Sequence, residues 1–482
     1  MDQLSHESNA VTGHVQHTGD RDDLAAGDTQ AAAQPTACTA EPTNAKVAIW
    51  SLAAQHLAAS WDIRTYEFAA YLFLIVLFPD TLVPASIFGF ATTGVAICLS
   101  GPVGRLVDTS PRLAFVRRCI IVQKLTVLSA YSLFLVLFLR LRSDGISAKA
   151  WSIFACIVAL SAVLNLSNVA YSVSIERDWI TSIAQGDSVT LTTLNAWLRR
   201  IDLVTKLVAP LVMSALSAGV SYPFSIAFML GYSVASFAFQ MWCGLDTLFW
   251  IAIVWQRCPV LGIDEKNRLA ARQAARTARQ QQLSSLTLGQ RAKARLNGIK
   301  AAASQLFVDW HDFARHEVFP TSVAISLLYL TVLSFDGTMI SWLKSHGYSD
   351  PFIAGMRGVN VVTGLLGTVA MPWLEKRIGI ARTGTWSIIS EAVSLIPVLL
   401  SFFLSPPPRG QTAAGWNEAL LFTGMAMSRI GLWAFDLCQL KLLQTLLEQH
   451  PRRNALTALQ FSLQNMMDLL KSVLSNMKLS TI

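Results

Sequence analysis

Charged residues are scarce in this 482-residue chain. Asp, Glu, Lys and Arg make up 14% of it, hydrophobic residues make up 53%, and the mean hydropathy is +0.44. A soluble domain usually carries about 25% charged residues. The shortage argues against a set of soluble domains. It favours an all-α polytopic membrane protein, because a helical apolar run of roughly 20 residues spans a bilayer.

Motifs of ATP-driven pumps and hydrolases are also missing. The sequence has no GxxxxGK[ST] phosphate-binding loop, which argues against ATP-driven transport. It has no GxSxG or HExxH motif either, and the chain is not expected to be an enzyme. None of the seven cysteines forms a CxxC pair, and most lie in apolar runs, where cysteine is usually a small buried hydrophobe. No signal peptide is recognisable.

Apolar runs of membrane length recur along the rest of the chain. About eleven are visible, six before a basic segment and five after it. This order is typical of major-facilitator transporters, which are two-lobed bundles of twelve helices. The runs lie near residues 47–76, 82–102, 113–139, 150–175, 197–218, 223–254, 317–343, 352–373, 379–404, 414–445 and 455–475.

Four regions follow from this pattern. Residues 1–45 are polar and are predicted to be a disordered cytosolic tail. Residues 46–255 are predicted to form a six-helix lobe, and residues 256–315 a basic linker. Residues 316–482 are predicted to form a second lobe without the last helix of such a fold. The positive-inside rule places the linker and the N-terminus in the cytosol. The net charge of +8 indicates contact with anionic lipid rather than nucleic acid.

Six phrases, in order along the chain, resemble the ferroportin family (solute carrier family 40), the iron-exporting branch of the major-facilitator superfamily. The resemblance covers nearly all the spans. It implies a twelve-helix fold that exports ferrous iron in exchange for protons, with a metal site in each lobe and no cofactor besides the transported metal. The phrases are "SIERDWI", "LNAWLRRIDLVTKLVAP", "YLTVLSFDGTMISWL", "GLLGTVAMPWLEKRIGIARTG", "RIGLWAFDL" and "LQNMMDLL".

Charged residues in the first span are candidate ligands. A charge at the bilayer centre costs roughly 2.5–3.5 kcal/mol, and ferrous iron prefers carboxylate, imidazole and thiolate ligands. Asp62 and Glu67 are separated by about 140° around a regular helix, so both reach one ion only if the helix is irregular or the ion lies between their faces. Against animal ferroportins, Ile63 takes the position of a ligand Asp, and Glu67 that of a His. Alternatively, Glu67 simply pairs with Arg64.

Two later spans place acids near arginines. Asp202, in the fifth span, matches a family Asp near the first-lobe cavity, which makes it a candidate ligand. Its alternative role is an ion pair with Arg199 or Arg200. In the tenth span, Arg429 and Asp436 are seven residues apart and nearly share a face, so they are expected to form a structural ion pair.

The resemblance also implies a gate at the cytosolic side. In the family, the Asp of the "RDW" phrase forms this gate together with an Asn and a basic residue. The Gly-rich segment "GPVGRLVDTSPRLAFVRR" adds charges to the same side. The gating candidates are Arg64, Asp108, Asp178, Asn195, Arg199, Arg200 and Arg453.

The second lobe departs from the animal pattern. Asp336 is a candidate ligand, and the following Gly337 allows a break in the helix. Animal ferroportins have a Cys at the Gly337 position that binds metal and hepcidin, so hepcidin regulation is not expected. Asp468 matches a family Asp, whereas Lys471 replaces a ligand His and cannot bind metal while protonated. Asp468 and Lys471 therefore either pair with each other or share a modified site.

These observations predict an exporter of ferrous iron that works by alternating access, with carboxylates such as Glu67 and Asp202 exchanging metal for protons. The expected partners are a divalent metal ion and the lipid bilayer of a plasma or vacuolar membrane. One alternative is an exporter of cobalt, nickel or manganese, into a vacuole or out of the cell. Another is a non-transporting scaffold or receptor descended from a transporter.

Overall fold

The structure is a computed structural model. It describes residues 42–78, 81, 83–141, 148–241, 249–258, 288–330, 348–404 and 415–479, with scattered positions between 261 and 281 and at 339 and 343. Almost all of the predicted tail lies outside these residues, and so do Asp336 and Gly337.

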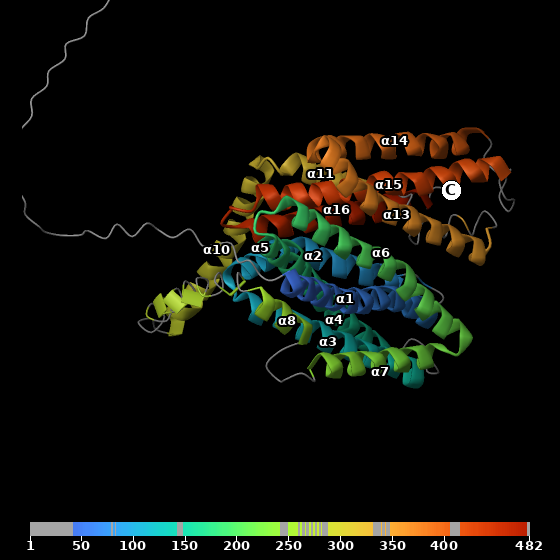
Figure 1. Ribbon diagram of the computed structural model, residues 1–482. Helices are drawn as coiled ribbons and strands as arrows, with labels where there is room; N and C mark the ends of the chain where they lie inside the picture. The colour runs from blue at the N-terminus through green and yellow to red at the C-terminus, as the bar shows by residue number, and fades with distance from the viewer. Residues whose placement is uncertain are drawn as a thin grey trace, which may run out of the picture.

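The described helices form two bundles (Figure 1). The first is the lower bundle of the figure, and two of its helices contain or adjoin π-helical turns, η1 and η2. Its elements are α1 (Pro42–Leu77), α2 (Val83–Thr109), α3 (Arg112–Val136), η1 (Leu137–Leu141), α4 (Ala148–Ser172), η2 (Val173–Trp179), α5 (Ile180–Ala184), α6 (Ser188–Gly219), α7 (Tyr222–Met241) and α8 (Phe249–Arg257).

The second bundle follows a helix from the predicted linker. Its members are α11 (Phe319–Leu328), α13 (Asp350–Ile378), α14 (Ile380–Leu404), α15 (Gly415–Leu446) and α16 (Arg453–Leu479), and the linker helix is α10 (Leu288–Arg315). Both α5 and α10 lie at one end of the bundles (Figure 1). We call this end, where α6 and α16 also begin, the linker end.

Six of the described helices are long and apolar enough to cross a membrane. Large apolar side chains on their outer surfaces, such as Phe90 and Phe403, are exposed, as lipid contact requires. Helices α1, α15 and α16 are not among the six, and all three carry charged and amide side chains. The six spans are Val83–Thr109, Arg112–Leu139, Ala148–Ala184, Ser188–Gly219, Phe352–Ile378 and Ile380–Ser401.

Two long interfaces join the bundles. Helix α2 packs along α16, and α6 packs against α13 and α15. At the linker end, α2 approaches α16 so closely that a Cβ atom on Gly104 would overlap the backbone of Asn454 and Ala455. The Gly-rich segment therefore permits close helix approach, as its composition predicts. The structure differs in placing Gly104, Arg105 and Asp108 inside α2 rather than in a connection.

Two other expectations change in detail. The sixth apolar run contains two described helices, α7 and α8, and α8 packs against α1 through apolar side chains such as Ile251 and Val254. Part of the predicted linker is α10, whose Phe313 is fully buried in a cluster with Leu456 and Leu459 of α16.

The turn before α6 is sharp because Gln185 and Gly186 have φ angles of 50° and 81°.

Candidate functional site

A buried histidine and an aspartate meet between α1 and α6. His56 and Ser60 are four residues apart and share one face of α1. His56 Nε2 lies 3.1 Å from Asp202 Oδ1, and the Ser60 hydroxyl donates to the same oxygen at 2.8 Å. His56 Nδ1 is buried and has no hydrogen-bond partner among the described residues. One imidazole nitrogen is therefore unused at this site.

Glu176 completes a group of three ligands. It lies in η2, and one carboxylate oxygen of Glu176, one nitrogen of His56 and one oxygen of Asp202 are all within 4.8 Å of one another. In the part of the chain that the structure describes, no other set of three His, Cys, Asp or Glu residues meets this condition. One imidazole nitrogen and two carboxylates suit manganese, iron, cobalt or nickel in the divalent state.

Arg199 connects this group to the second bundle. Its guanidinium lies 3.6 Å from Asp202 Oδ2 and 2.7 Å from Asp436 Oδ2 on α15. It also lies over the ring of Trp433, 5.5 Å from the ring centroid. The arginine thus balances carboxylates from both bundles at a point where they meet.

Asp178 is the centre of an ionic cluster nearer the linker end. This residue is fully buried. Arg112 on α3 donates to both of its carboxylate oxygens, at 2.6 and 2.9 Å, and Arg453 at the start of α16 forms a second ion pair with it. The pair with Arg453 joins the two bundles.

Polar contacts close the linker end between the bundles. The side-chain amides of Asn195 and Gln444 bond to each other in both directions, at 2.6 and 3.1 Å. Lys441 donates to Thr192 on α6 and forms an ion pair with Glu375. Three further contacts belong to this closure: Arg200 to the hydroxyl and carbonyl of Thr368, Asp108 to the amides of Asn454 and Ala455, and Lys441 to Ser188.

A family model described as Ferroportin1 (FPN1) matches residues 46–477. The chain belongs to the ferroportin family. Solute carrier family 40 member 1 of Oryza sativa subsp. japonica is 29% identical to it, over 87% of this chain and 82% of that protein. The ferroportin of Homo sapiens is 25% identical, over 87% of this chain and 84% of that protein.

Solved structures confirm the fold. A bacterial homologue of the iron transporter ferroportin in an outward-facing state has a TM-score of 0.68 and 22% identity, and 88% of this chain and 90% of that chain are covered. A proton:xylose symporter of the major facilitator superfamily has a TM-score of 0.59 and 12% identity, with 89% and 88% covered. This ferroportin-family chain is therefore a multi-pass membrane protein with a transporter fold.

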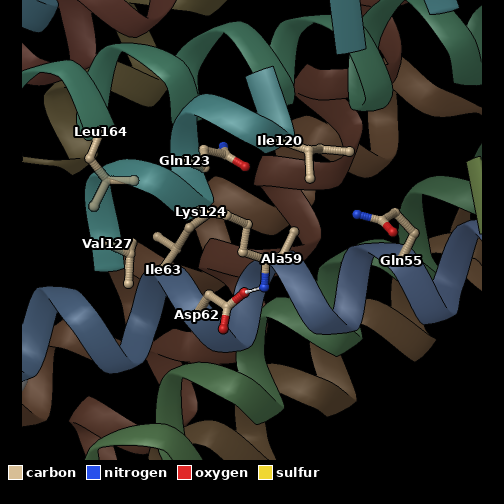
Figure 2. A pocket seen from close by; sticks show the side chains of 9 residues that line it. All are labelled: Gln55, Ala59, Asp62, Ile63, Ile120, Gln123, Lys124, Val127 and Leu164. Atoms are coloured by element: carbon tan, nitrogen blue, oxygen red, sulfur yellow. Dashed lines mark hydrogen bonds and ion pairs between the residues drawn. The ribbon is translucent and has the colours of Figure 1, made fainter. Parts of the chain in front are cut away.

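The first-span candidates of this ferroportin-family chain separate onto different faces of α1. Asp62 points toward α3, where it pairs with Lys124, and Lys124 also donates to Ser236 at 2.9 Å. Figure 2 shows this pair at the edge of a small pocket that Gln55 and Gln123 also line. Glu67 pairs with Arg64 at 2.8 Å, and its side chain is 49% exposed. Neither Asp62 nor Glu67 belongs to the three-ligand group.

The second-bundle candidates are only partly described. Asp468 and Lys471 lie 2.7 Å apart, the local pairing that one of the two alternatives expects. Asp436 pairs with Arg199 on α6, and a pair between Arg429 and Asp436 stays a prediction. The roles of Asp336 and Gly337 in metal binding and in hepcidin regulation fall outside the described residues.

Sequence reasoning found Asp202 but missed its two partners. His56 stands in the first span as a lone histidine, with no spacing to any other candidate. Glu176 belongs to the quoted "SIERDW" phrase, but two residues from Asp178 it looks like another gate charge. The useful signal was a histidine inside an apolar run, because imidazole at that depth is costly without a partner.

Proposed function

We propose that this protein is a secondary transporter that exports ferrous iron or a chemically similar divalent metal from the cytosol by alternating access. The observation that carries the proposal is the group of His56, Glu176 and Asp202, placed between helices of the first bundle. In this proposal the metal is the transported substrate, and no resident cofactor is needed.

The donor set supports a first-row transition metal. An imidazole and two carboxylates bind manganese, iron, cobalt and nickel, and a thiolate that would favour softer ions is not part of the group. The names of the relatives point the same way, since they are ferroportins and members of solute carrier family 40. The same three donor groups, one imidazole and two carboxylates, also favour a second candidate function, the export of cobalt, nickel or manganese.

The closure at the linker end supports alternating access. If this end faces the cytosol, as its basic linker predicts, the structure corresponds to a state closed to the cytosol. Breaking the contacts of Asp178, Asn195 and Lys441 would then open a cytosolic route to the site. In this proposal the N-terminus lies in the cytosol, and the protein lies in the plasma membrane or the vacuolar membrane.

Proton exchange follows from the same ligands. A metal requires a deprotonated imidazole nitrogen and carboxylates, so protons and metal compete for the same lone pairs. His56, Asp202 and Glu176 would take up protons when the metal leaves on the far side and release them when it binds. Transport is therefore proposed to be proton-coupled.

Uptake into proteoliposomes tests the proposal. We expect the wild type to transport Fe²⁺ and Co²⁺. We expect His56→Gln, which removes a proposed ligand, to lower Co²⁺ affinity by more than the roughly 10–100-fold that follows from changing a residue that only orients a ligand. His311→Gln, which changes an exposed histidine on α10, is the matched control and should transport normally. Normal transport by His56→Gln would remove the site assignment. Absent flux in a folded wild type would favour the scaffold alternative.

A further inference from the structure

One π-helical turn carries both a ligand and a gate residue. Within η2, Glu176 contributes to the three-ligand group, and Asp178, two residues later, is held by Arg112 and Arg453. Such a turn, with its i→i+5 hydrogen bonds, is rare and often occurs at functional sites. Here the turn lets residues only two apart serve two different clusters.

The backbone of Glu176 is held from the opposite bundle. Gln444 on α15 donates its side-chain amide to the carbonyl oxygen of Glu176 at 2.7 Å. The same amide group also exchanges two hydrogen bonds with Asn195 on α6. Gln444 and Asn195 are both buried. The orientation of the Gln444 amide is thus fixed by α6 while it contacts η2.

We propose that Gln444 is a positioning residue for the transported metal, and that it holds the π-helical turn so that Glu176 points toward His56 and Asp202. The inference rests on the proposed function and goes further, since Gln444 touches no metal ligand atom. When the bundles separate at the linker end, the hydrogen bond to Glu176 is lost and the turn is released. The site then keeps His56 and Asp202, but Glu176 is no longer held in place.

The arrangement makes the metal site complete in the closed state and incomplete in the open one. Metal affinity and closure are therefore coupled, and the coupling is reciprocal: closure strengthens binding by the same factor by which the metal favours closure. The contact differs from the hydrogen bonds of Lys441 to Ser188 and Thr192 on α6, which join the bundles without touching η2. This difference provides a matched control.

Cobalt binding to the purified full-length protein tests the proposal. The d–d absorption spectrum of bound Co²⁺ reports its ligands, whereas the affinity also reflects how often the bundles are closed. We expect Gln444→Met to lower Co²⁺ affinity by about tenfold, as the loss of a residue that holds a metal ligand in place does, and to shift the spectrum toward that of Glu176→Gln. At saturating Co²⁺, Lys441→Gln should lower the affinity but keep the wild-type spectrum, because bound metal favours the closed state and Gln444 still holds Glu176 in that state.

A second variant covers the case in which Gln444→Met does not fold. Asn195→Ser keeps Gln444 and all three ligands but removes the partner that orients the amide, so a smaller spectral shift in the same direction is expected. A wild-type spectrum in the folded Gln444 or Asn195 variant overturns the proposal. An equal spectral change in Lys441→Gln also overturns it, since general opening would then explain the effect. Failure of the wild type to bind Co²⁺ would instead contradict the proposed function.

Discussion

At the scale of single residues, the charges of α1 have three different environments within a few turns. His56 is buried beside Asp202, Asp62 is mostly buried beside Lys124, and Glu67 is half exposed beside Arg64. The pair of Asp62 and Lys124 lies within the first bundle, and the described residues that it contacts or that line the pocket beside it belong to the same bundle. Its effect should therefore be on stability rather than on the closure of the linker end.

Removing one member of this buried pair should be costly. We expect Lys124→Met to destabilise the protein by about 3–5 kcal/mol, because it leaves the carboxylate of Asp62 buried without its cation. Thermal unfolding in detergent measures the effect. The double variant Asp62→Asn/Lys124→Met should recover most of the loss, since neither charge remains. A double variant as unstable as the single one would show that the ion pair is not the cause.

At the scale of helices, the closed linker end depends on small residues. Gly104 lies on α2 where this helix meets the start of α16. Gly94, further back on α2, has no atom of another described helix within 4 Å of where a Cβ would be. The two glycines are therefore a matched pair on one helix. Cys438 gives a native reporter of separation, because it is fully buried in a cluster that includes Ala196 of the opposite bundle.

A methyl group at Gly104 should open the linker end. Gly104→Ala forces the backbones of α2 and α16 apart, and overpacking of this kind costs about 1–3 kcal/mol. The contact exists only in the closed state, so the open population should rise by about 5–150-fold. Maleimide labelling of Cys438 should accelerate accordingly, with Cys438→Ser identifying the labelled site. Gly94→Ala should label like the wild type, and equal acceleration in both variants would contradict the explanation.

At the scale of the whole molecule, the predicted fold class and family are confirmed, because both depend on long apolar runs and on phrases spread over the chain. Ion pairs within one helix could also be predicted from the sequence, because Arg64 and Glu67, and likewise Asp468 and Lys471, are three residues apart. The contacts of Asp202 with His56, of Asp62 with Lys124 and of Arg199 with Asp436 join different helices.

Periodicity within one helix does not reveal which faces of two helices meet. The π-helical turn adds a second obstacle, because its i→i+5 pattern shifts the faces on which Glu176 and Asp178 lie. A regular spacing of 100° per residue therefore predicts the wrong helix faces for Glu176 and Asp178. The three-ligand group could be found only in the structure.

Helix α10 connects the two bundles through charge. Its buried Asp309 lies 3.4 Å from Arg105 on α2 and 2.7 Å from Arg452 beside α16, and Arg452 also pairs with Asp312. The hydrogen bond from Arg452 holds the pKa of Asp312 below its usual value. The backbone amide of Arg452 donates to His450 Nδ1 at 3.1 Å, which requires this nitrogen to be unprotonated.

The docking of α10 should therefore weaken in acid. Burial, and next the charges of His316 and Arg452, lower the pKa of His450 below the usual value of 6.5. A lowered histidine pKa means that its contribution is complete above about pH 6.5 and is lost as the pH falls through the folded-state pKa. Asp312 would lose its contribution only near pH 4 and below, where free carboxylates protonate. Hydrogen-exchange protection of α10 should thus fall between pH 7.5 and pH 5.5, after correction for intrinsic exchange.

Two variants separate His450 from other groups. His450→Asn keeps an acceptor near the position of Nδ1 but does not titrate, so protection of α10 should become independent of pH over this range. His311→Gln changes an exposed histidine on α10 itself and should retain the wild-type dependence. If His450→Asn still loses protection in acid, another group controls the attachment of α10, and the connection between the bundles is not sensitive to pH through this turn.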